Sequence, residues 1–238
     1  MEPTRINKYI AECGIASRRD ADKLILAGKV LINGKAASPG DKITDADEII
    51  VNGKPLTGKN DKIVLAYYKP IGVTCTEKDR FAEKKITDVI NYPVRVTYAG
   101  RLDKDSEGLI LLSNDGDLIN KLMKGSNQHE KEYLVKINKE VTDDFVKKMS
   151  EGMYLKEIDI TTRPCKVEKI GKYSFKIILT QGVNRQIRRM CKSLNCYVTH
   201  LKRVRVANIE LAGMKTGELR IIEGKELQAL YNIIHYEK

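Results

Sequence analysis

The chain has 238 residues, of which 43 are lysine or arginine and 32 are acidic, so its formal charge is +11. A hydrophobic content of 42% is enough for a buried core, and the length suits one or two domains. A basic balance of this size favours a polyanionic partner, nucleic acid more often than a membrane surface. MEPTRINKY has no apolar signal core, and no run of about eighteen apolar residues follows, so we expect a cytoplasmic protein without membrane contact.

The five cysteines are odd in number, no pair is spaced as CxxC, and the chain has only three histidines. This pattern disfavours both a disulfide framework and a zinc cluster. We therefore expect reduced thiols and no metal site.

The N-terminal part predicts two helices, one over residues 4–13 and one from a cap at Ser17 to Gly28. Two strands follow, over residues 30–32 and 48–51, and each is followed by an Asn–Gly pair typical of a hairpin turn. These elements predict a compact helix–helix–strand–strand unit.

The first turn of the second helix carries Arg18 and Arg19. Positive charge at a helix N-terminus opposes the helix dipole and costs about a few tenths of a kcal/mol for each residue. Folding alone would favour Asp or Glu here, so the two arginines indicate an external anion such as a phosphate. The alternative is that both side chains are solvated and that salt screens the cost.

A polar, glycine-containing segment over residues 56–62 reads LTGKNDK and predicts a linker. We accordingly expect two domains, residues 1–60 and 61–238. The second domain is predicted to begin with a strand that ends at Lys69–Pro70, because proline restricts its own backbone and that of the residue before it.

The stretch Gly100–Asp117 reads GRLDKDSEGLILLSNDGD, a polar loop that runs into an apolar strand at Leu109–Leu112. The continuous apolar run predicts a central strand of a sheet. In the loop, Asp103 lies between Arg101 and Lys104, which favours its ionised form. A short loop of mixed charge is also typical of a solvated turn, so this pattern alone does not identify a site.

Periodicity and capping residues predict further elements along the chain. In chain order they are a helix over residues 86–90, a helix capped by Asp117, a strand over 133–137, a helix capped by Thr142, a strand over 173–179 and a helix over 223–236. No internal repeat and no low-complexity segment is present in the sequence.

Residues 169–209 contain ten lysines or arginines and no acidic residue. Their centre, GVNRQIRRMC, predicts a helix that buries Ile187. Arg185, Arg188 and Arg189 would then occupy its other faces. A basic helix face is often merely solvated, but surface helices usually mix charges to avoid self-repulsion. The stretch therefore favours contact with nucleic acid, and Lys202, Arg203 and Arg205 are expected to extend it.

Two parts of the sequence resemble known families. The pattern RINKYIAECGIASRRDADKLILAGKVLINGK, within residues 4 to 50, resembles the S4-type RNA-binding module. Behind it, GRLDKDSEGL, HEKEYLV and NRQIRRMC resemble ribosomal RNA pseudouridine synthases of the RsuA family, which includes the RluB, RluE and RluF types. HEKEYLV and NRQIRRMC make the RluF type the most similar branch. The resemblance runs over nearly the whole chain.

The resemblance implies an α+β fold. It has a small N-terminal α/β S4-like RNA-binding domain and a catalytic domain whose mixed, mainly antiparallel central sheet is flanked by helices. The implied activity is isomerisation of a flipped-out uridine to pseudouridine in ribosomal RNA, with the large subunit (23S rRNA) favoured and a tRNA left open as an additional substrate. We expect no cofactor, because one carboxylate can serve every step of the reaction. We also expect a monomer.

By the same resemblance, Asp103 is the catalytic carboxylate, Arg188 its charge partner and Tyr133 the ring that stacks on the flipped base. Whether Asp103 attacks C1′ or removes a ribose proton stays open. Ile187 is expected under the base, and Asp105 is expected to form structural hydrogen bonds. Further contacts with RNA are expected from Lys69, Arg18, Arg19, Arg101, Arg185 and Arg189.

Two other classes of protein could also have a basic sequence of this kind. A non-enzymatic RNA-binding or ribosome-assembly protein would need the basic residues but not Asp103. A sugar hydrolase would need a second, protonated acid about 5 Å from the first, and the acid-free basic stretch disfavours it. Asp103 is therefore the residue that discriminates between an enzyme and a binding protein.

Overall fold

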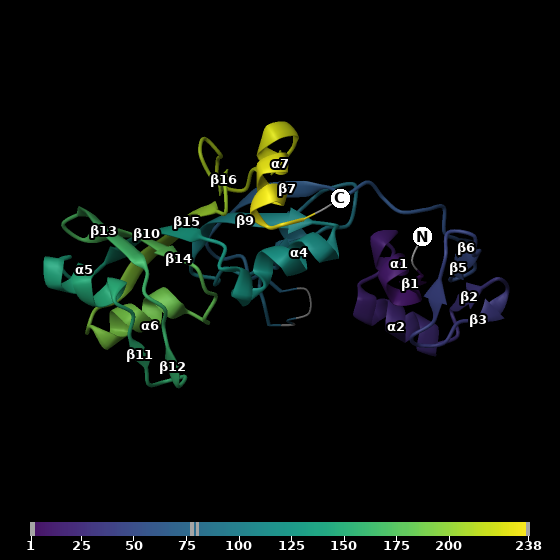
Figure 1. Cartoon of the computed structure of the whole chain (residues 1–238), viewed down its shortest axis with the longest axis horizontal. Helices are drawn as coiled ribbons and strands as arrows, with labels where there is room; N and C mark the ends of the chain where they lie inside the picture. Colours follow the sequence, from purple (N-terminus) through teal and green to yellow (C-terminus); the bar gives the residue numbers. More distant parts are fainter. Residues whose placement is uncertain (1–2, 77–78, 80, 237–238) are drawn as a thin grey trace. The chain divides into compact units, whose positions relative to one another are not determined.

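The computed structural model describes residues 3–76, 79 and 81–236, and the chain divides into two compact units. The first comprises Met1–Ile63 with Tyr92–Thr97, and the second comprises Val64–Asn91 with Tyr98–Lys238. Figure 1 shows the helices and strands of both units in the colours of the sequence.

The described part of the first unit holds two helices and two small sheets. Its elements are β1 (Thr4–Arg5), α1 (Ile6–Glu12), α2 (Arg18–Leu26), β2 (Val30–Ile32), β3 (Lys35–Ala36), β4 (Lys42–Ile43), β5 (Ile49–Val51) and β6 (Lys54–Pro55). β1 pairs with β4, and the other sheet has the antiparallel order β3-β2-β5-β6. The pattern of the sequence predicts both helices, β2 and β5, whereas strands of two residues are too short for it to detect.

Local sequence explains the boundaries in this unit. The Ser17 hydroxyl accepts a hydrogen bond from the Asp20 amide (3.2 Å), which caps α2 as predicted. Both Asn–Gly turns, after β2 and β5, have positive φ at both residues, the conformation of a type I′ hairpin turn. The apolar faces of the helices pack on the strands in a core that includes Ile10, Ile25 and Val51.

The second unit is built on a nine-stranded sheet. Its elements are β7 (Val64–Lys69), α3 (Ile86–Val89), β8 (Thr97–Ala99), β9 (Glu107–Ser113), α4 (Gly116–Met123), a 3₁₀ turn (Gly125–Asn127), β10 (Lys131–Ile137), α5 (Asp143–Ser150), β11 (Tyr154–Leu155), β12 (Ile160–Thr161), β13 (Lys166–Gly171), β14 (Ser174–Leu179), α6 (Gln186–Ser193), β15 (Val198–Val206), β16 (Ile209–Glu210), β17 (Leu219–Ile221) and α7 (Gly224–Ile233).

The sheet follows the order β13-β14-β10-β15-β9-β7-β17, with β16 added to β15 and β8 to β9. Along this order β9 and β15 are parallel, and every other neighbouring pair is antiparallel. β11 and β12 form a separate hairpin. The predicted mixed, mainly antiparallel sheet with flanking helices is confirmed, and β9 is central in it as its apolar sequence predicts.

Two hydrophobic clusters attach the helices to this sheet. Leu118 of α4 and Leu230 of α7 share a cluster with Leu109 of β9. Met190 of α6 lies in a second cluster with Ile177 of β14, which also holds the buried face of α5. Figure 1 accordingly shows α5 and α6 beside β10 and β14, and α4 and α7 beside β7 and β9.

The start of α4 differs from the prediction, in which Asp117 is the cap. Asp115 is the N-cap, because its Oδ1 accepts hydrogen bonds from the amides of Asp117 (3.1 Å) and Leu118 (3.2 Å). Asp115 is buried, and the hydroxyl of Tyr236 donates to its other carboxylate oxygen. This partner comes from far along the chain, so local sequence did not indicate which aspartate begins the helix.

β9 and β15 approach each other closely at Gly108, which is paired with Arg203. Gly108 has a φ of +115°, and a Cβ atom there would lie 2.2 Å from the Arg203 carbonyl oxygen. Only glycine tolerates both this conformation and this approach. The loop that precedes β9 is thereby held beside β15.

Candidate active site

A cavity of about 500 Å³ opens in the second unit. Its walls are formed by the loop at residues 100–106 and by residues 181–188, which lead into and begin α6. Its floor is a face of the sheet that carries Lys131, Tyr133 and Arg203. The GRLDKDSEGL, HEKEYLV and NRQIRRMC motifs thus meet at one place.

Strand register explains why these floor residues lie together. Lys131 and Tyr133 are two residues apart on β10, so their side chains point to the same face of the sheet. Arg203 of β15 pairs directly with Tyr133, and Leu179 of β14 pairs with Lys131. Directly paired residues of antiparallel strands share a face, so these side chains converge.

The loop that carries Asp103 is held from behind by the segment after β7. The amide of Leu102 donates to Cys75 Sγ (3.5 Å), and the amide of Gly72 donates to the Lys104 carbonyl (2.8 Å). The carboxylate of Asp103 is 27% exposed and lines the cavity. The backbone on both sides of Asp103 is therefore positioned by contacts that sequence reasoning did not detect.

Lys69 corrects a sequence-based expectation, because it cannot contact RNA. Its side chain is 0% exposed, and its ammonium group donates to the carbonyls of Pro70 and Val73, both at 2.8 Å. Burial lowers the pKa of Lys69, although the charges of Asp103 and Asp105 oppose that effect. Lys69 therefore holds the turn that supports the Asp103 loop.

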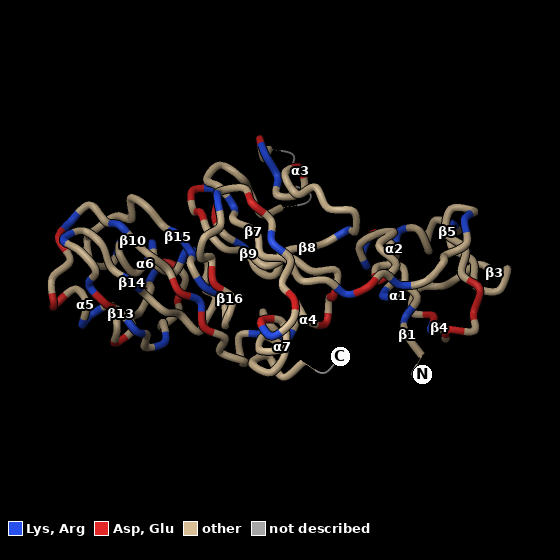
Figure 2. Tube along the Cα trace, turned by 90° about the horizontal axis from the view of Figure 1, so that it is seen from above, with Lys and Arg blue, Asp and Glu red and all other residues tan. Residues whose placement is uncertain are grey.

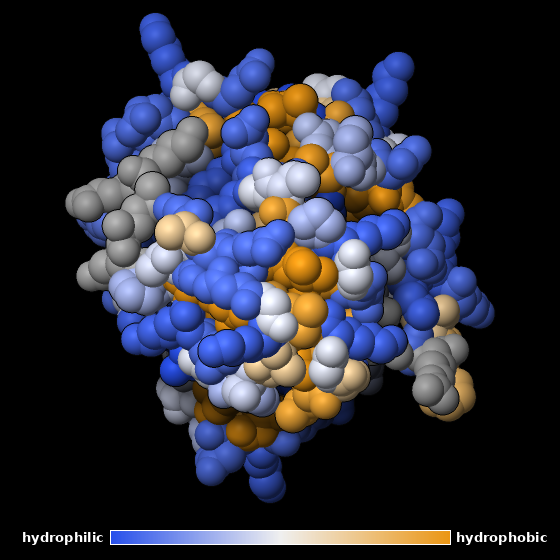
Figure 3. Space-filling model, turned by 90° about the vertical axis from the view of Figure 1, so that its right-hand side faces the viewer, coloured by the Kyte–Doolittle hydropathy of each residue, from blue (hydrophilic) through white to orange (hydrophobic). Residues whose placement is uncertain are grey.

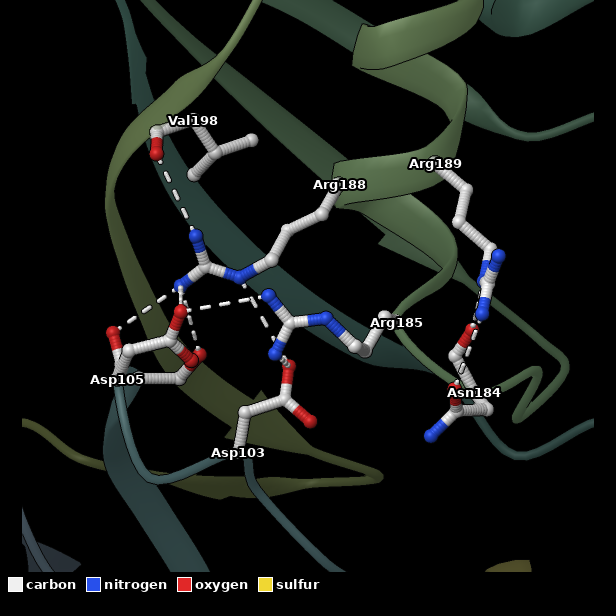
Figure 4. Close-up of polar contacts among 8 residues, drawn as sticks. Asp103, Asp105, Asn184, Arg185, Arg188, Arg189 and Val198 are labelled. Carbon is white, nitrogen blue, oxygen red and sulfur yellow. Dashed lines mark hydrogen bonds and ion pairs between the residues drawn. The ribbon is translucent and has the colours of Figure 1, made fainter.

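Two arginines flank the Asp103 carboxylate (Figure 4). Arg185 Nη1 lies 3.3 Å and Arg188 Nε lies 3.7 Å from Asp103 Oδ2. Arg188 also donates to the carbonyl of Asp105 (3.0 Å) and to the hydroxyl of Ser106 (3.2 Å). The structure thus brings Asp103 and Arg188 together as the sequence analysis expects, and it adds Arg185 as the nearer cation.

The two arginines differ in how firmly they are held. The side chain of Arg188 is 15% exposed, whereas that of Arg185 is 43% exposed. Arg185 is the N-cap of α6 and has a positive φ of 52°, a conformation that is uncommon outside glycine. Asp105 Oδ2 lies 3.2 Å from Arg188 Nη2 and 3.4 Å from Arg185 Nη2, so it links both arginines as a structural partner.

The remaining residues expected near the base also reach the cavity. Tyr133 is half-buried on the floor, Ile187 is buried in the first turn of α6, and Arg101 is exposed at the wall. Arg189 instead turns toward Asn184, whose carbonyl accepts from its Nε (3.1 Å), and toward Glu157. Figure 4 shows Arg189 separated from the Asp103 group, so its role here is to hold the turn before α6.

In the folded chain, carboxylates of other segments lie beside residues 169–209. The stretch therefore does not form the uninterrupted basic surface that its sequence predicts. Carboxylates from other segments pair with many of its cations, and Figure 2 shows both signs of charge interleaved along this unit. These ion pairs are Lys176 with Glu168, Arg189 and Lys192 with Glu157, and Arg205 with Glu130 and Glu132. Arg203 is buried. Sequence order alone cannot show such partners, because they lie on other strands and loops.

In the first unit, Arg18 and Arg19 are exposed at the start of α2. Neither has an ion-pair partner among the residues that the structure describes. The view in Figure 3 looks onto this unit and shows mainly hydrophilic side chains around smaller apolar patches. Ile15 and Leu26, at either end of this helical segment, are exposed apolar residues.

Sequence reasoning gave Lys131 and Cys75 no role of their own in the site, and it placed Arg203 only in the basic stretch expected to contact nucleic acid. Lys131 and Arg203 are buried cations on the cavity floor. Desolvation by burial, together with repulsion from Arg203, lowers the pKa of Lys131 to about 8. The signal for Lys131 is its position two residues before Tyr133 on the same strand, which places both on one face.

Within the described ranges, no group of three His, Cys, Asp or Glu side chains is arranged to hold a metal ion. Nor does any helix in that part of the chain have the length and apolar character needed to span a bilayer. The site offers instead a carboxylate, an aromatic ring and several cations around a cavity large enough for one nucleoside.

Comparison with known proteins identifies the family. The family model described as RNA pseudouridylate synthase matches residues 63–193, which include Asp103, Tyr133 and Arg188. The chain belongs to this family. The S4 domain model matches residues 4–49 of the same pseudouridine synthase. The predicted family and its N-terminal module are confirmed.

Relatives of this pseudouridine synthase extend over nearly its whole length. The Escherichia coli protein named dual-specificity RNA pseudouridine synthase RluF is 44% identical over 232 residues, which are 97% of this chain and 79% of that protein. The Bacillus subtilis protein named ribosomal large subunit pseudouridine synthase B is 35% identical over 240 residues, 98% of both chains. A solved crystal structure of a pseudouridylate synthase has a TM-score of 0.70 and 29% identity, and covers 95% of this chain and 99% of its own.

Proposed function

We propose that this enzyme converts uridine to pseudouridine in ribosomal RNA of the large subunit, with Asp103 as its catalytic carboxylate. The observation that supports the proposal is the convergence of Asp103, Arg188 and Tyr133 on one cavity of about 500 Å³. The names of the Escherichia coli and Bacillus subtilis relatives support the choice of RNA. "Dual-specificity" in the first name is a reason to examine tRNA as an additional substrate.

The proposed reaction exchanges one bond of the ribose for another. The bond from C1′ to N1 of uracil breaks, the ring turns, C5 joins C1′, the proton on C5 leaves, and N1 gains a proton. Asp103 acts on the ribose, either by attack on C1′ or by removal of a ribose proton. Arg188 and Arg185 orient the carboxylate through Oδ2 and leave its second oxygen for the substrate.

The uridine must leave the RNA stack before Asp103 can reach C1′. Tyr133 then supplies a flat face for the extruded base, and stacking of this kind is worth about 1–3 kcal/mol per base. Ile187 closes the apolar side of the cavity. Arg101 and Arg185, both exposed at the cavity, are placed to meet phosphates next to the flipped nucleotide.

The two domains divide the work in this proposal. Residues 1–60 bind structured RNA, with Arg18 and Arg19 at exposed positions that suit phosphate contacts. Residues 61–238 carry the reaction. We expect the protein to act in the cytoplasm as a monomer.

Mapping of pseudouridines tests the substrate. Ribosomal RNA and tRNA from cells that lack the protein are incubated with the purified enzyme, treated with carbodiimide and read by reverse-transcription stops. We expect a new stop at one or a few uridines of the large-subunit RNA. New stops confined to small-subunit RNA or tRNA would refute the large-subunit assignment, and no new stop would refute the proposed substrate class.

A further inference from the structure

Two cations lie on the cavity floor without a carboxylate partner. Lys131 is 8% exposed and Arg203 is 2% exposed. Among the described residues neither forms an ion pair. The Lys131 ammonium donates to the His129 carbonyl (3.1 Å), and Arg203 Nε donates to the Leu109 carbonyl (2.7 Å). The Nη2 atom of Arg203 is buried and has no hydrogen-bond partner.

Such an arrangement is unfavourable for folding. A buried charge loses its hydration, and two like charges on one sheet face repel each other. The lowered pKa of Lys131 reflects these two effects. Several other cations of this unit form ion pairs, for example Arg205 with Glu130 and Glu132 on the opposite face of the same strands. Lys131 and Arg203 therefore have unused positive charge at the place where the substrate base must lie.

We propose that Lys131 and Arg203 bind the uracil ring during the interval in which it is detached from the ribose and negatively charged. The inference rests on the proposed function, because it needs a uridine whose C1′ faces Asp103. In this proposal Asp103 acts on the sugar, and Lys131 and Arg203 stabilise the leaving base. Tyr133, paired with Arg203 and two residues from Lys131, holds the ring plane beside both cations.

Cleavage of the bond leaves negative charge on the ring, and cations beside the ring stabilise that charge. When the bond between C1′ and N1 breaks, its electron pair stays on N1 and is shared with O2 and O4 of the ring. The ribose becomes electron-deficient and is met by Asp103. The ring returns an electron pair when C5 bonds to C1′, the C5 proton then leaves, and N1 takes up a proton, so that the product is an isomer of the substrate. No oxidant or reductant takes part, and preorganised cations stabilise charge where it develops.

A phosphate group of the RNA is the competing anion, and the position of the two cations disfavours it. Phosphates stay on the outside of an extruded nucleotide, where Arg101 and Arg185 are exposed. Lys131 and Arg203 lie on the floor, on the strands that carry Tyr133 and Leu201. The two possibilities predict different measurements, because a phosphate contact acts on binding and a leaving-base contact acts on the rate of conversion.

The test uses the full chain and a synthetic RNA that contains the mapped uridine. Lys131→Met and Arg203→Met keep side-chain volume and remove charge. We expect each to lower the single-turnover rate of pseudouridine formation by about 100- to 1000-fold, the usual effect of removing a donor to a developing anion. The Kd for RNA should change little, because neither cation contacts a phosphate in this proposal. Lys136→Met, on an exposed position of the same strand, should leave the rate unchanged.

Thermal unfolding separates this role from a structural one. Lys131→Met removes an unpaired buried charge but also the donor to the His129 carbonyl, so the two effects oppose each other and the Tm should change little. A lower Tm with the rate restored on cooling would mean that Lys131 only supports the fold, and would overturn the proposal. A loss confined to Kd would assign the two cations to a phosphate and would also overturn it.

The leaving base itself gives the sharpest comparison. Fluorine at C5 of uracil withdraws electrons and stabilises the detached anion. We expect the rate defect of Lys131→Met in cleavage of the bond from C1′ to N1 to be at least tenfold smaller with 5-fluorouridine than with uridine. An equal defect for both bases would contradict the inference. If the wild type converts no uridine in the RNA, the proposed function fails; if wild type and both variants convert it equally, only this inference fails.

Discussion

At the residue scale, the site shows that basic residues of an RNA-modifying enzyme can be buried within the fold instead of being exposed to RNA phosphates. Lys69, Lys131 and Arg203 are all buried, and each donates to backbone carbonyls of its own unit. The resemblance to a known family places Asp103, Tyr133 and Arg188 from sequence, because their motifs are specific. Burial of the other cations depends on strand register and on neighbours from distant segments, which composition and local pattern do not encode.

Lys69→Met tests the corrected role of Lys69. The substitution leaves the buried carbonyls of Pro70 and Val73 without their donor, and an unsatisfied buried polar group costs about 1–3 kcal/mol. We expect a lower free energy of unfolding in urea and a slower reaction, because the turn supports the Asp103 loop. RNA affinity should be unchanged. A selective loss of RNA affinity at normal stability would restore the original expectation of a contact with RNA.

The pH dependence of the reaction reports on Lys131. Its pKa is lowered to about 8, so the ammonium is charged below pH 8 and neutral above it. The titratable or charged groups around Lys131 are Arg203 from β15, the neutral ring of His129, and Asp103 across the cavity. Strand β14 contributes the apolar Leu179.

We expect the single-turnover rate to fall as pH rises through about 8. In Lys131→Arg this fall should be absent, because a guanidinium remains charged in that range. Rates are measured from pH 6 to 10 with saturating RNA. An unchanged alkaline limb in Lys131→Arg would show that another group causes it.

At the element scale, the sequence predicts where most helices and long strands begin, because caps and apolar periodicity act locally. Ser17 and Thr142 cap their helices as predicted. Asp115 takes the place predicted for Asp117, because a distant tyrosine and burial select it. The parallel contact of β9 with β15 also joins segments far apart in the chain, and only its single glycine, Gly108, hints at it.

Gly108→Ala tests that close approach. The φ of +115° alone costs a non-glycine residue about 1–3 kcal/mol, and the new Cβ would also meet the Arg203 carbonyl oxygen at 2.2 Å. We expect a large loss of stability in urea unfolding and a loss of activity, because the loop before β9 carries Asp103. Gly116→Ala is the matched control: it lies in α4 with open space around it, so stability should stay level or rise slightly. Equal stability of both variants would show that β9 and β15 can separate without effect.

At the scale of the whole molecule, net charge correctly indicates an RNA partner, but it does not show where the RNA lies. The cations of residues 169–209 are largely paired or buried, whereas Arg18 and Arg19 have no ion-pair partner in the described part of the chain. The local conflict between two arginines and a helix N-terminus is therefore a better guide to phosphate contact than the count of basic residues.

A combined Arg18→Gln and Arg19→Gln variant tests this assignment. Each phosphate contact contributes about one unit to the slope of log K against log salt concentration, so the slope should fall by about two. Affinity for long ribosomal RNA should weaken, while conversion of bound RNA should proceed at the normal rate. Lys23→Gln, in the same helix but paired with Asp20 at 3.0 Å, is the control and should keep the slope. An unchanged slope in the double variant would mean that both arginines are only solvated.

The measurement that tests the central claim most directly is the single-turnover yield of pseudouridine with Asp103→Asn. Asparagine keeps the shape of the side chain and removes the charge that faces the ribose. The account predicts a folded variant that binds RNA with normal affinity and forms no pseudouridine above background. Asp144→Asn, at an exposed position of α5, should retain full activity. Full conversion by Asp103→Asn would contradict the proposed mechanism, because it would show that Asp103 is not the catalytic carboxylate.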